Sequence, residues 1–160
     1  NTGIAGALGE GLRICDFAVS TGAVYHDVDL IGFGYKLGEI PGQPIEYTAD
    51  EDLLALAENA FGKISASKEH KLVKGRIASG DQFISSPEKK NYIKQNFSPV
   101  CVEMEGTAIA HACYLNNVPF LIVRCMSDMA DEQDEKVSVF NENIAADLSA
   151  EFVMKIIELL

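Results

Sequence analysis

Val102-Glu103-Met104-Glu105-Gly106-Thr107-Ala108 is the stretch around which this chain is organised. In it two carboxylates flank a methionine, where an apolar segment gives way to a helix that the spacing places from Ala108 onward. Asn116-Asn117 and Pro119 end that helix, and residues 120–126 follow as a second apolar strand. We therefore predict a βαβ unit with parallel strands and a right-handed crossover.

Acidic residues follow both strands of this predicted unit. Glu105 comes after the first strand and Ser127-Asp128 after the second, so parallel strands would bring them to the same carboxyl edge, where open α/β sheets bind ligands. Each also has a plainer interpretation, because acids favour helix N-termini and Ser-Asp is a common turn sequence. Their coincidence at one edge favours a functional site.

Length and composition limit the class of protein. At 160 residues, we predict a single domain over residues 1–160 with a substantial core. The 24 acidic and 13 basic residues give a net charge of -11, which would repel nucleic acid, and no apolar run is long enough to span a membrane. Four cysteines without a metal-type spacing favour free thiols in a reducing compartment, so we expect a cytoplasmic protein.

The rest of the chain alternates between strands and helices. Residues 1–6 have no strand before them and no initiator Met, so we expect a chain that begins inside its domain, with a glycine-rich turn. His26, Asp27 and Asp29 lack a further ligand at a recognisable spacing, so neither a metal nor another cofactor is expected. The remaining expected elements are a strand at 17–20, an irregular segment at 25–47, a capping box at 48–51 with its helix, a strand at 71–79, a helix from Ser86-Pro87, and a helix at 141–160.

Five stretches together resemble the 5′-methylthioadenosine/S-adenosylhomocysteine nucleosidases of the nucleoside phosphorylase superfamily. They are Thr2-Gly3-Ile4-Ala5-Gly6, Tyr25-His26-Asp27-Val28-Asp29, Ser79-Gly80-Asp81-Gln82-Phe83-Ile84, residues 102–108 and residues 123–131. The resemblance implies a three-layer α/β fold, in which helices flank a central mixed β-sheet. It also implies hydrolysis of the N-glycosidic bond of methylthioadenosine and adenosylhomocysteine, with release of adenine.

The resemblance assigns catalytic roles to three residues. Asp128 would protonate, or hydrogen-bond to, purine N7 as the glycosidic bond breaks, and Ser127 would orient it. Arg124 would help to organise the water network. A neutral adenine leaves more easily than its anion, and a positioned acid of this kind contributes about 10²–10⁴-fold to the rate.

The resemblance also implies a nucleoside-binding set. Glu105 would bind the ribose 2′- and 3′-hydroxyls with Met104 against the sugar, Phe83 would stack on adenine, and the Ile84 backbone would read the adenine edge. The further binding residues are Glu103, Ala5, Gly6, Phe33 and Pro41. Phe33, Tyr35 and Pro41 resemble a loop that reaches into the neighbouring subunit's site, so the expected assembly is a homodimer.

This chain departs from the family in two ways, and three alternatives stay open. The family's water-activating glutamate has no counterpart in these residues, and Ile4 stands where many members have Ser. The aromatic lid residue corresponds to Val139 or Phe140. The alternatives are a purine nucleoside phosphorylase, which needs a phosphate site that residues 2–6 do not supply; an enzyme for futalosine-type nucleosides; and a nucleoside-binding protein without catalysis.

Overall fold

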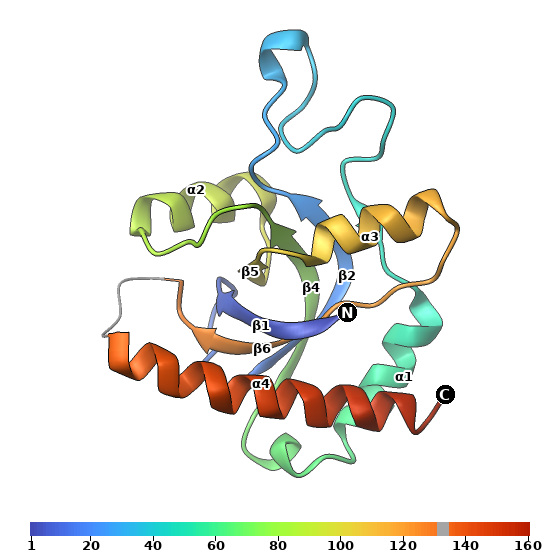
Figure 1. Ribbon diagram of the computed structural model, residues 1–160, viewed down its shortest axis with the longest axis vertical. Coiled ribbons are helices and arrows are strands. Elements are labelled where there is room, and N and C mark those ends of the chain that lie inside the picture. Colours follow the sequence, from blue (N-terminus) through green and yellow to red (C-terminus); the bar gives the residue numbers. More distant parts are fainter. Residues whose placement is uncertain (131–134) are drawn as a thin grey trace.

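Strands and helices alternate along most of the chain (Figure 1). The computed structural model describes residues 1–130 and 135–160, and the side chains of 1–130 and 141–160. The strands are β1 (Thr2–Ala7), β2 (Phe17–Tyr25), β3 (Tyr47–Thr48), β4 (Leu72–Ser79), β5 (Cys101–Glu103) and β6 (Val123–Asp128). The α-helices are α1 (Glu51–Phe61), α2 (Pro87–Phe97), α3 (Gly106–Leu115) and α4 (Glu135–Ile157), and short 3-10 helices cover Ile31–Phe33 and Ser65–Lys68.

The strands form one mixed sheet that closes on itself. Their order is β3-β2-β4-β5-β1-β6, and β2 also pairs with β6. Residues 17–19 of β2 pair with β6, whereas residues 22–23 pair with β3. Strands β2, β4 and β5 are parallel to one another, and β1 is parallel to β6. The mixed sheet expected from the sequence is confirmed, and its closure brings strands from both ends of the chain together.

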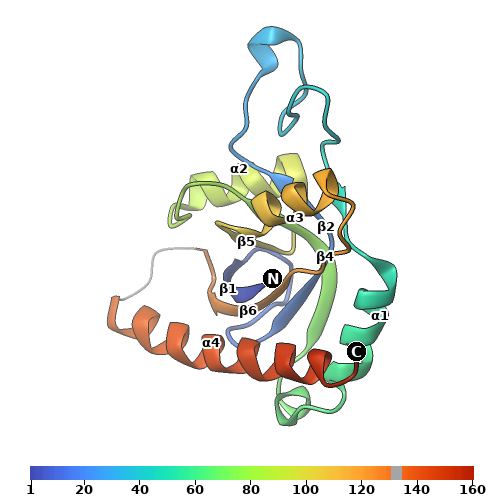
Figure 2. The same cartoon turned by 45° about the vertical axis from the view of Figure 1, so that its right-hand side comes forward.

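Helices flank this sheet on opposite sides in both views, with α4 along one side and α2 and α3 on the other (Figures 1 and 2). Helix α4 packs on β1 and β6, and α1 packs on α4 and β2. Edge-to-face rings of Phe17, Phe61 and Phe152 join these elements, with centroids 5.3–5.4 Å apart. Among the described residues, no helix combines the length and the apolar character that crossing a membrane requires.

Local signals placed most helices correctly, with one error in a cap. Ser86 accepts a hydrogen bond from the Lys89 amide, so α2 starts as expected at Ser86-Pro87. Helix α1 starts one residue beyond a cap at Asp50, whose carboxylate accepts from the Leu53 amide at 2.9 Å. The predicted capping box with Thr48 as cap is therefore wrong, because Thr48 belongs to β3. Helix α4 begins at Glu135 rather than at residue 141.

The predicted glycine-rich turn at the start of the chain is wrong, because these residues form strand β1. Close contacts across the sheet explain why glycines occur in this strand. A Cβ atom on Gly3 would collide with the Arg124 guanidinium, and one on Gly6 would lie 2.8 Å from Asp128 Oδ1. Both glycines therefore leave room inside a strand for functional side chains of β6.

The predicted parallel βαβ unit is also wrong. Strand β1 lies between β5 and β6, and β5 runs antiparallel to β1, so β5 and β6 run in opposite directions. A local pattern cannot reveal a strand inserted from more than 90 residues away. Gly6 of β1 is nevertheless paired with Val102 on one side and with Asp128 on the other. The stretch after β5 and the end of β6 therefore still meet, across β1.

Candidate active site

A cavity of about 250 Å³ opens where β1 lies between the ends of β5 and β6. A recess of about 30 Å³ shares six of its residues and extends to Ile84. The structure thus gathers most of the predicted site residues. The larger cavity is lined by Ile4, Ala5, Gly6, Phe83, Val102, Glu103, Met104, Glu105, Ser127, Asp128 and Glu142.

Asp128 ends β6 with its carboxylate held from two sides. The Ser127 hydroxyl donates to Oδ2 at 2.8 Å, and the Ala130 amide donates to Oδ1 at 2.7 Å. Ser127 is buried, whereas Asp128 is half-buried and lines the cavity. The neighbouring groups therefore fix the direction of a carboxylate that a ligand can still reach.

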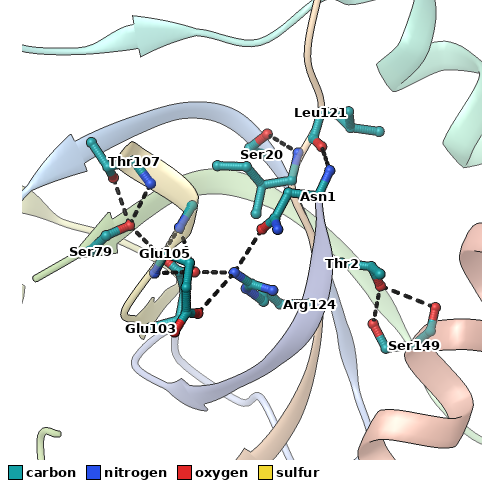
Figure 3. A network of polar contacts seen from close by, with 12 residues as sticks. Asn1, Thr2, Ser20, Ser79, Glu103, Glu105, Thr107, Leu121, Arg124 and Ser149 are labelled. Atoms are coloured by element: carbon teal, nitrogen blue, oxygen red, sulfur yellow. Dashed lines mark hydrogen bonds and ion pairs between the residues drawn. The ribbon is translucent and has the colours of Figure 1, made fainter. Parts of the chain in front are cut away.

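A buried ion pair joins Glu103, which lines the cavity, to Arg124 (Figure 3). Both side chains are 2% exposed. Glu103 also accepts hydrogen bonds from the Ser79 hydroxyl and the Gly106 amide, and Arg124 donates to Asn1 Oδ1 at 2.8 Å. Arg124 does not line the cavity, and the Glu103 carboxylate is occupied by bonds within the protein. Such a pair holds its surroundings in one geometry, which favours a positioning role for both residues.

Glu105 differs from Glu103 in its exposure. Its side chain is 66% exposed and lines the cavity, and its Oε2 lies 3.6 Å from Arg124 Nη2. Glu105 is the N-cap residue of α3, but its side chain makes no capping hydrogen bond. The simple capping interpretation of this acid therefore lacks its main contact, and the carboxylate is available to a ligand.

Two polar residues that support this arrangement escaped the sequence-based prediction of the site. Ser79 Oγ accepts a hydrogen bond from the Thr107 amide at 2.8 Å (Figure 3). The Thr107 hydroxyl donates to the Val24 carbonyl at 2.9 Å. These contacts tie the start of α3 to strands β2 and β4. Ser79 follows the apolar pair Ile77-Ala78 at the end of β4, which was the available signal. Glu142 of α4 also lines the cavity and was missed as well, because only the packing of α4 on β1 and β6 brings it there.

Two large apolar side chains face the cavity. Phe83 is 65% exposed and Met104 is 42% exposed, although both residue types are usually buried. Ile84 is buried and lines only the adjoining recess. The arrangement leaves an uncovered apolar surface beside the carboxylates, suited to an aromatic ring.

Three predicted residues lie elsewhere. Phe33, Tyr35 and Pro41 belong to the segment between β2 and β3, which projects away from the sheet (Figures 1 and 2). Phe33 is 82% exposed and none of the three lines the cavity. Val139 and Phe140, the candidates for a lid, lie in α4 but outside the residues whose side chains are described.

The cysteines take no part in the cavity. All four are free, and Cys101 and Cys125 are buried. Burial raises the pKa of Cys125 to about 12, and burial also raises the pKa of Cys101. Thiols of this kind stay protonated and do not act as nucleophiles near neutral pH. Within the described part of the chain, no group of three His, Cys, Asp or Glu residues could hold a metal ion.

Comparison with known proteins places this chain in a family. The sequence model of the phosphorylase superfamily matches residues 1–158. A 5′-methylthioadenosine/S-adenosylhomocysteine nucleosidase of Staphylococcus carnosus is 45% identical over 99% of this chain and 68% of its own length. The crystal structure of that nucleosidase from Neisseria meningitidis, in complex with methylthio-immucillin-A, has a TM-score of 0.93 at 37% identity, over 100% of this chain and 68% of its own.

A related enzyme is similar to nearly the same degree. Futalosine hydrolase of Helicobacter pylori has a TM-score of 0.92 at 36% identity, over 99% of this chain and 66% of its own. The identity to the Staphylococcus carnosus protein is higher, and it extends over almost the whole of this chain. The chain therefore belongs to the phosphorylase superfamily and, within it, to the 5′-methylthioadenosine/S-adenosylhomocysteine nucleosidases.

Proposed function

We propose that this protein hydrolyses the N-glycosidic bond of 5′-methylthioadenosine and S-adenosylhomocysteine, releasing adenine and the thioribose product. The observation that carries the proposal is one cavity lined by an exposed aromatic ring, Phe83, and by two accessible carboxylates, Glu105 and Asp128. A purine, a sugar diol and a leaving-group nitrogen require these three kinds of group. The family to which the chain belongs supports the same reaction.

In this proposal Asp128 acts on the leaving group. Its carboxyl group protonates or hydrogen-bonds to purine N7 while the bond between the sugar and the base breaks, so that adenine departs as a neutral molecule. Its bonds from Ser127 and Ala130 keep it in one orientation, and this supports the role, because proton transfer depends on geometry.

Glu105 binds the sugar and stabilises the positive charge that develops on the sugar ring. Its exposed carboxylate accepts hydrogen bonds from the ribose 2′- and 3′-hydroxyls, while Met104 packs against the ring. The bond breaks through an oxocarbenium-like transition state, which a nearby carboxylate stabilises. The ion pair of Arg124 with Glu103 holds Glu105 and the water network in place.

The charge of the cavity supports water rather than phosphate as the second substrate. Among the described residues, the charged side chains that line it are all acidic: Glu103, Glu105, Asp128 and Glu142. Arg124 is buried and paired with Glu103. Among the side chains that the structure describes, a phosphate dianion would meet repulsion and no exposed cation, so phosphorolysis by a purine nucleoside phosphorylase is the weaker alternative.

Futalosine-type nucleosides are a second candidate substrate class. The similarity to the Helicobacter pylori futalosine hydrolase supports it, since the TM-score is nearly that of the Neisseria meningitidis nucleosidase. The two substrate classes are separated by comparing kcat/KM for methylthioadenosine with kcat/KM for futalosine.

We further propose a homodimer as the working assembly. Phe33 and Pro41 do not line this chain's own cavity, and the segment between β2 and β3 that holds them projects from the sheet (Figure 1). Helix α3 also exposes Ile109, Tyr114 and Leu115, an unusual apolar surface for a helix facing water. A second copy that covers these groups would complete the 5′-alkylthio end of the site.

The deciding experiment measures adenine release from methylthioadenosine with and without phosphate, for the natural sequence and for Asp128→Asn. We expect release that does not depend on phosphate, and a loss of at least about 100-fold in kcat for the variant, since it removes the proposed acid. Release that requires phosphate would identify a phosphorylase. Binding of adenine without product would identify a nucleoside-binding protein, and an unchanged rate in the variant would refute the role of Asp128.

A further inference from the structure

The turn that follows β6 combines Asp128 with an unusual backbone conformation. Ala130, two residues beyond Asp128, is fully buried and has a φ of 51°, in the left-handed region that residues with a side chain rarely adopt. Such a conformation persists only where the surroundings enforce it. The contacts that enforce it here also determine where the Asp128 carboxylate points.

The peptide group between Met129 and Ala130 is held at both ends. Its carbonyl, on Met129, accepts a hydrogen bond from Lys90 Nζ at 2.5 Å. Its N–H, on Ala130, donates to Asp128 Oδ1 at 2.7 Å. Rotation of this peptide plane would break both bonds. The lysine charge at the carbonyl also polarises the group, which strengthens the N–H as a donor to the carboxylate.

Packing keeps Lys90 in reach of this peptide. Ala130 belongs to a buried cluster that also contains Ile93 and Phe97, which lie on the same helix as Lys90. On the opposite side, a Cβ atom on Gly6 would approach the Cβ of Ala130 to 2.9 Å, so β1 leaves just enough room for the turn. Helix α2 and the turn after β6, far apart in sequence, are therefore fixed relative to each other.

We propose that Lys90 is a positioning residue for Asp128. Through the Met129–Ala130 peptide its ammonium group holds the left-handed turn and fixes the direction of the Asp128 carboxylate toward the cavity. The proposal rests on the function proposed above, in which Asp128 acts on the purine. It extends the site to helix α2, to a residue that does not line the cavity and lies in none of the stretches that carry the family resemblance.

Kinetics on Lys90→Met, with Lys94→Met one turn further along α2 as the matched control, test this proposal. We expect Lys90→Met to lower kcat about tenfold with KM changed by less than about twofold, because it disturbs a group that acts in the transition state. Lys90→Arg should restore most of the loss, and Lys94→Met should match the natural sequence. Equal effects of the two Met variants would overturn the proposal.

A double variant with Asp128→Asn distinguishes a positioning role of Lys90 from a general loss of structure. In the Asp128→Asn background, Lys90→Met should cause no further loss in kcat, because the two residues act as one unit. Losses that multiply would show that Lys90 acts elsewhere.

A measurement that does not depend on activity keeps this proposal separate from the proposed function. The Ala130 amide proton should move upfield and exchange faster with solvent in Lys90→Met and not in Lys94→Met, as followed by nuclear magnetic resonance. Absence of adenine release by the natural sequence would refute the proposed function, while the amide would still report on Lys90. An Ala130 amide that does not respond to Lys90→Met would overturn the positioning role. Lys90→Ala, which also removes the donor to the Met129 carbonyl and favours a helix, replaces Lys90→Met if that variant does not fold, with the same expected outcomes.

Discussion

At the scale of single residues, the site depends on the small size of Gly6. This residue lies between Val102 and Asp128 in the sheet and lines the cavity itself. Its lack of a side chain lets the Asp128 carboxylate and the turn after it approach the β1 backbone. A small residue in a strand is thus a requirement of the site rather than of the strand.

We predict that Gly6→Ala lowers activity more than stability. The added Cβ would lie 2.8 Å from Asp128 Oδ1 and 2.9 Å from the Cβ of Ala130, so the carboxylate must shift. A displacement of this size in a catalytic group costs on the order of 10²-fold in rate. The measurement is kcat together with the unfolding midpoint. Gly62→Ala is the control, since its Cβ would only come within 3.8 Å of the Asn59 carbonyl and should leave kcat unchanged.

A second residue-scale prediction concerns His26, a buried histidine next to Gly80. Burial lowers its pKa, partly opposed by the charge of Asp27, and its Nε2 has no hydrogen-bond partner among the described residues. The folded state therefore binds this proton more weakly than the unfolded chain does. Stability should fall as the pH falls through the ordinary histidine pKa of about 6.5.

Urea unfolding at pH 7.5 and pH 5.5, values that span about one unit on either side of that pKa, measures this effect. The natural sequence should lose more free energy of unfolding between the two pH values than His26→Gln does. Equal losses in both proteins would mean that His26 does not contribute to the pH dependence.

At the scale of elements, helix starts are set by short-range hydrogen bonds and can be tested by single substitutions. We predict that Asp50→Ala destabilises the protein by about 1 kcal/mol, because the Leu53 amide loses its acceptor. Thr48→Ala is the matched control, since Thr48 is exposed and does not cap α1. Chemical unfolding of both variants measures the difference. A larger loss for Thr48→Ala would restore the capping box that the sequence pattern favoured.

The strands show why element-scale patterns are not enough to build the site. The apolar segments at β4, β5 and β6 were recognised from composition, because buried strands are rich in apolar residues. Strand β1 was not recognised, since its glycines serve contacts with β6 and weaken the local strand signal. With β1 missing, the direction of β5 relative to β6 could not be predicted correctly.

At the scale of the whole molecule, the projecting segment gives the proposed homodimer a direct test. We predict that Phe33→Ala raises KM for methylthioadenosine about tenfold with a smaller change in kcat, because an apolar contact to the alkylthio group contributes mainly to binding. Light scattering measures the oligomeric state alongside the kinetics. Lys36→Ala, on the same segment, should leave KM unchanged. A monomer with normal KM in Phe33→Ala would contradict the shared site.

The sequence by itself determined the helices that carry their own caps and periodic apolar faces, and the residue types that make up the cavity. These signals involve residues that are close in sequence, so they can be recognised without the structure. Ser86 and the motif around Glu105 are examples. Most residues named from the resemblance line one cavity, although the parallel strands expected to bring them together do not exist.

Only the tertiary structure decided how the strands are ordered and which side chains support the site from below. Arg124 with Glu103, Ser79 with Thr107, and Lys90 with Met129 are separated by 21 to 39 residues, and no spacing rule links them. Their contacts arise because the sheet closes through β2 and β6 and because β1 enters between β5 and β6. Pairing over such distances depends on the packing of the whole chain, which a local sequence pattern does not encode.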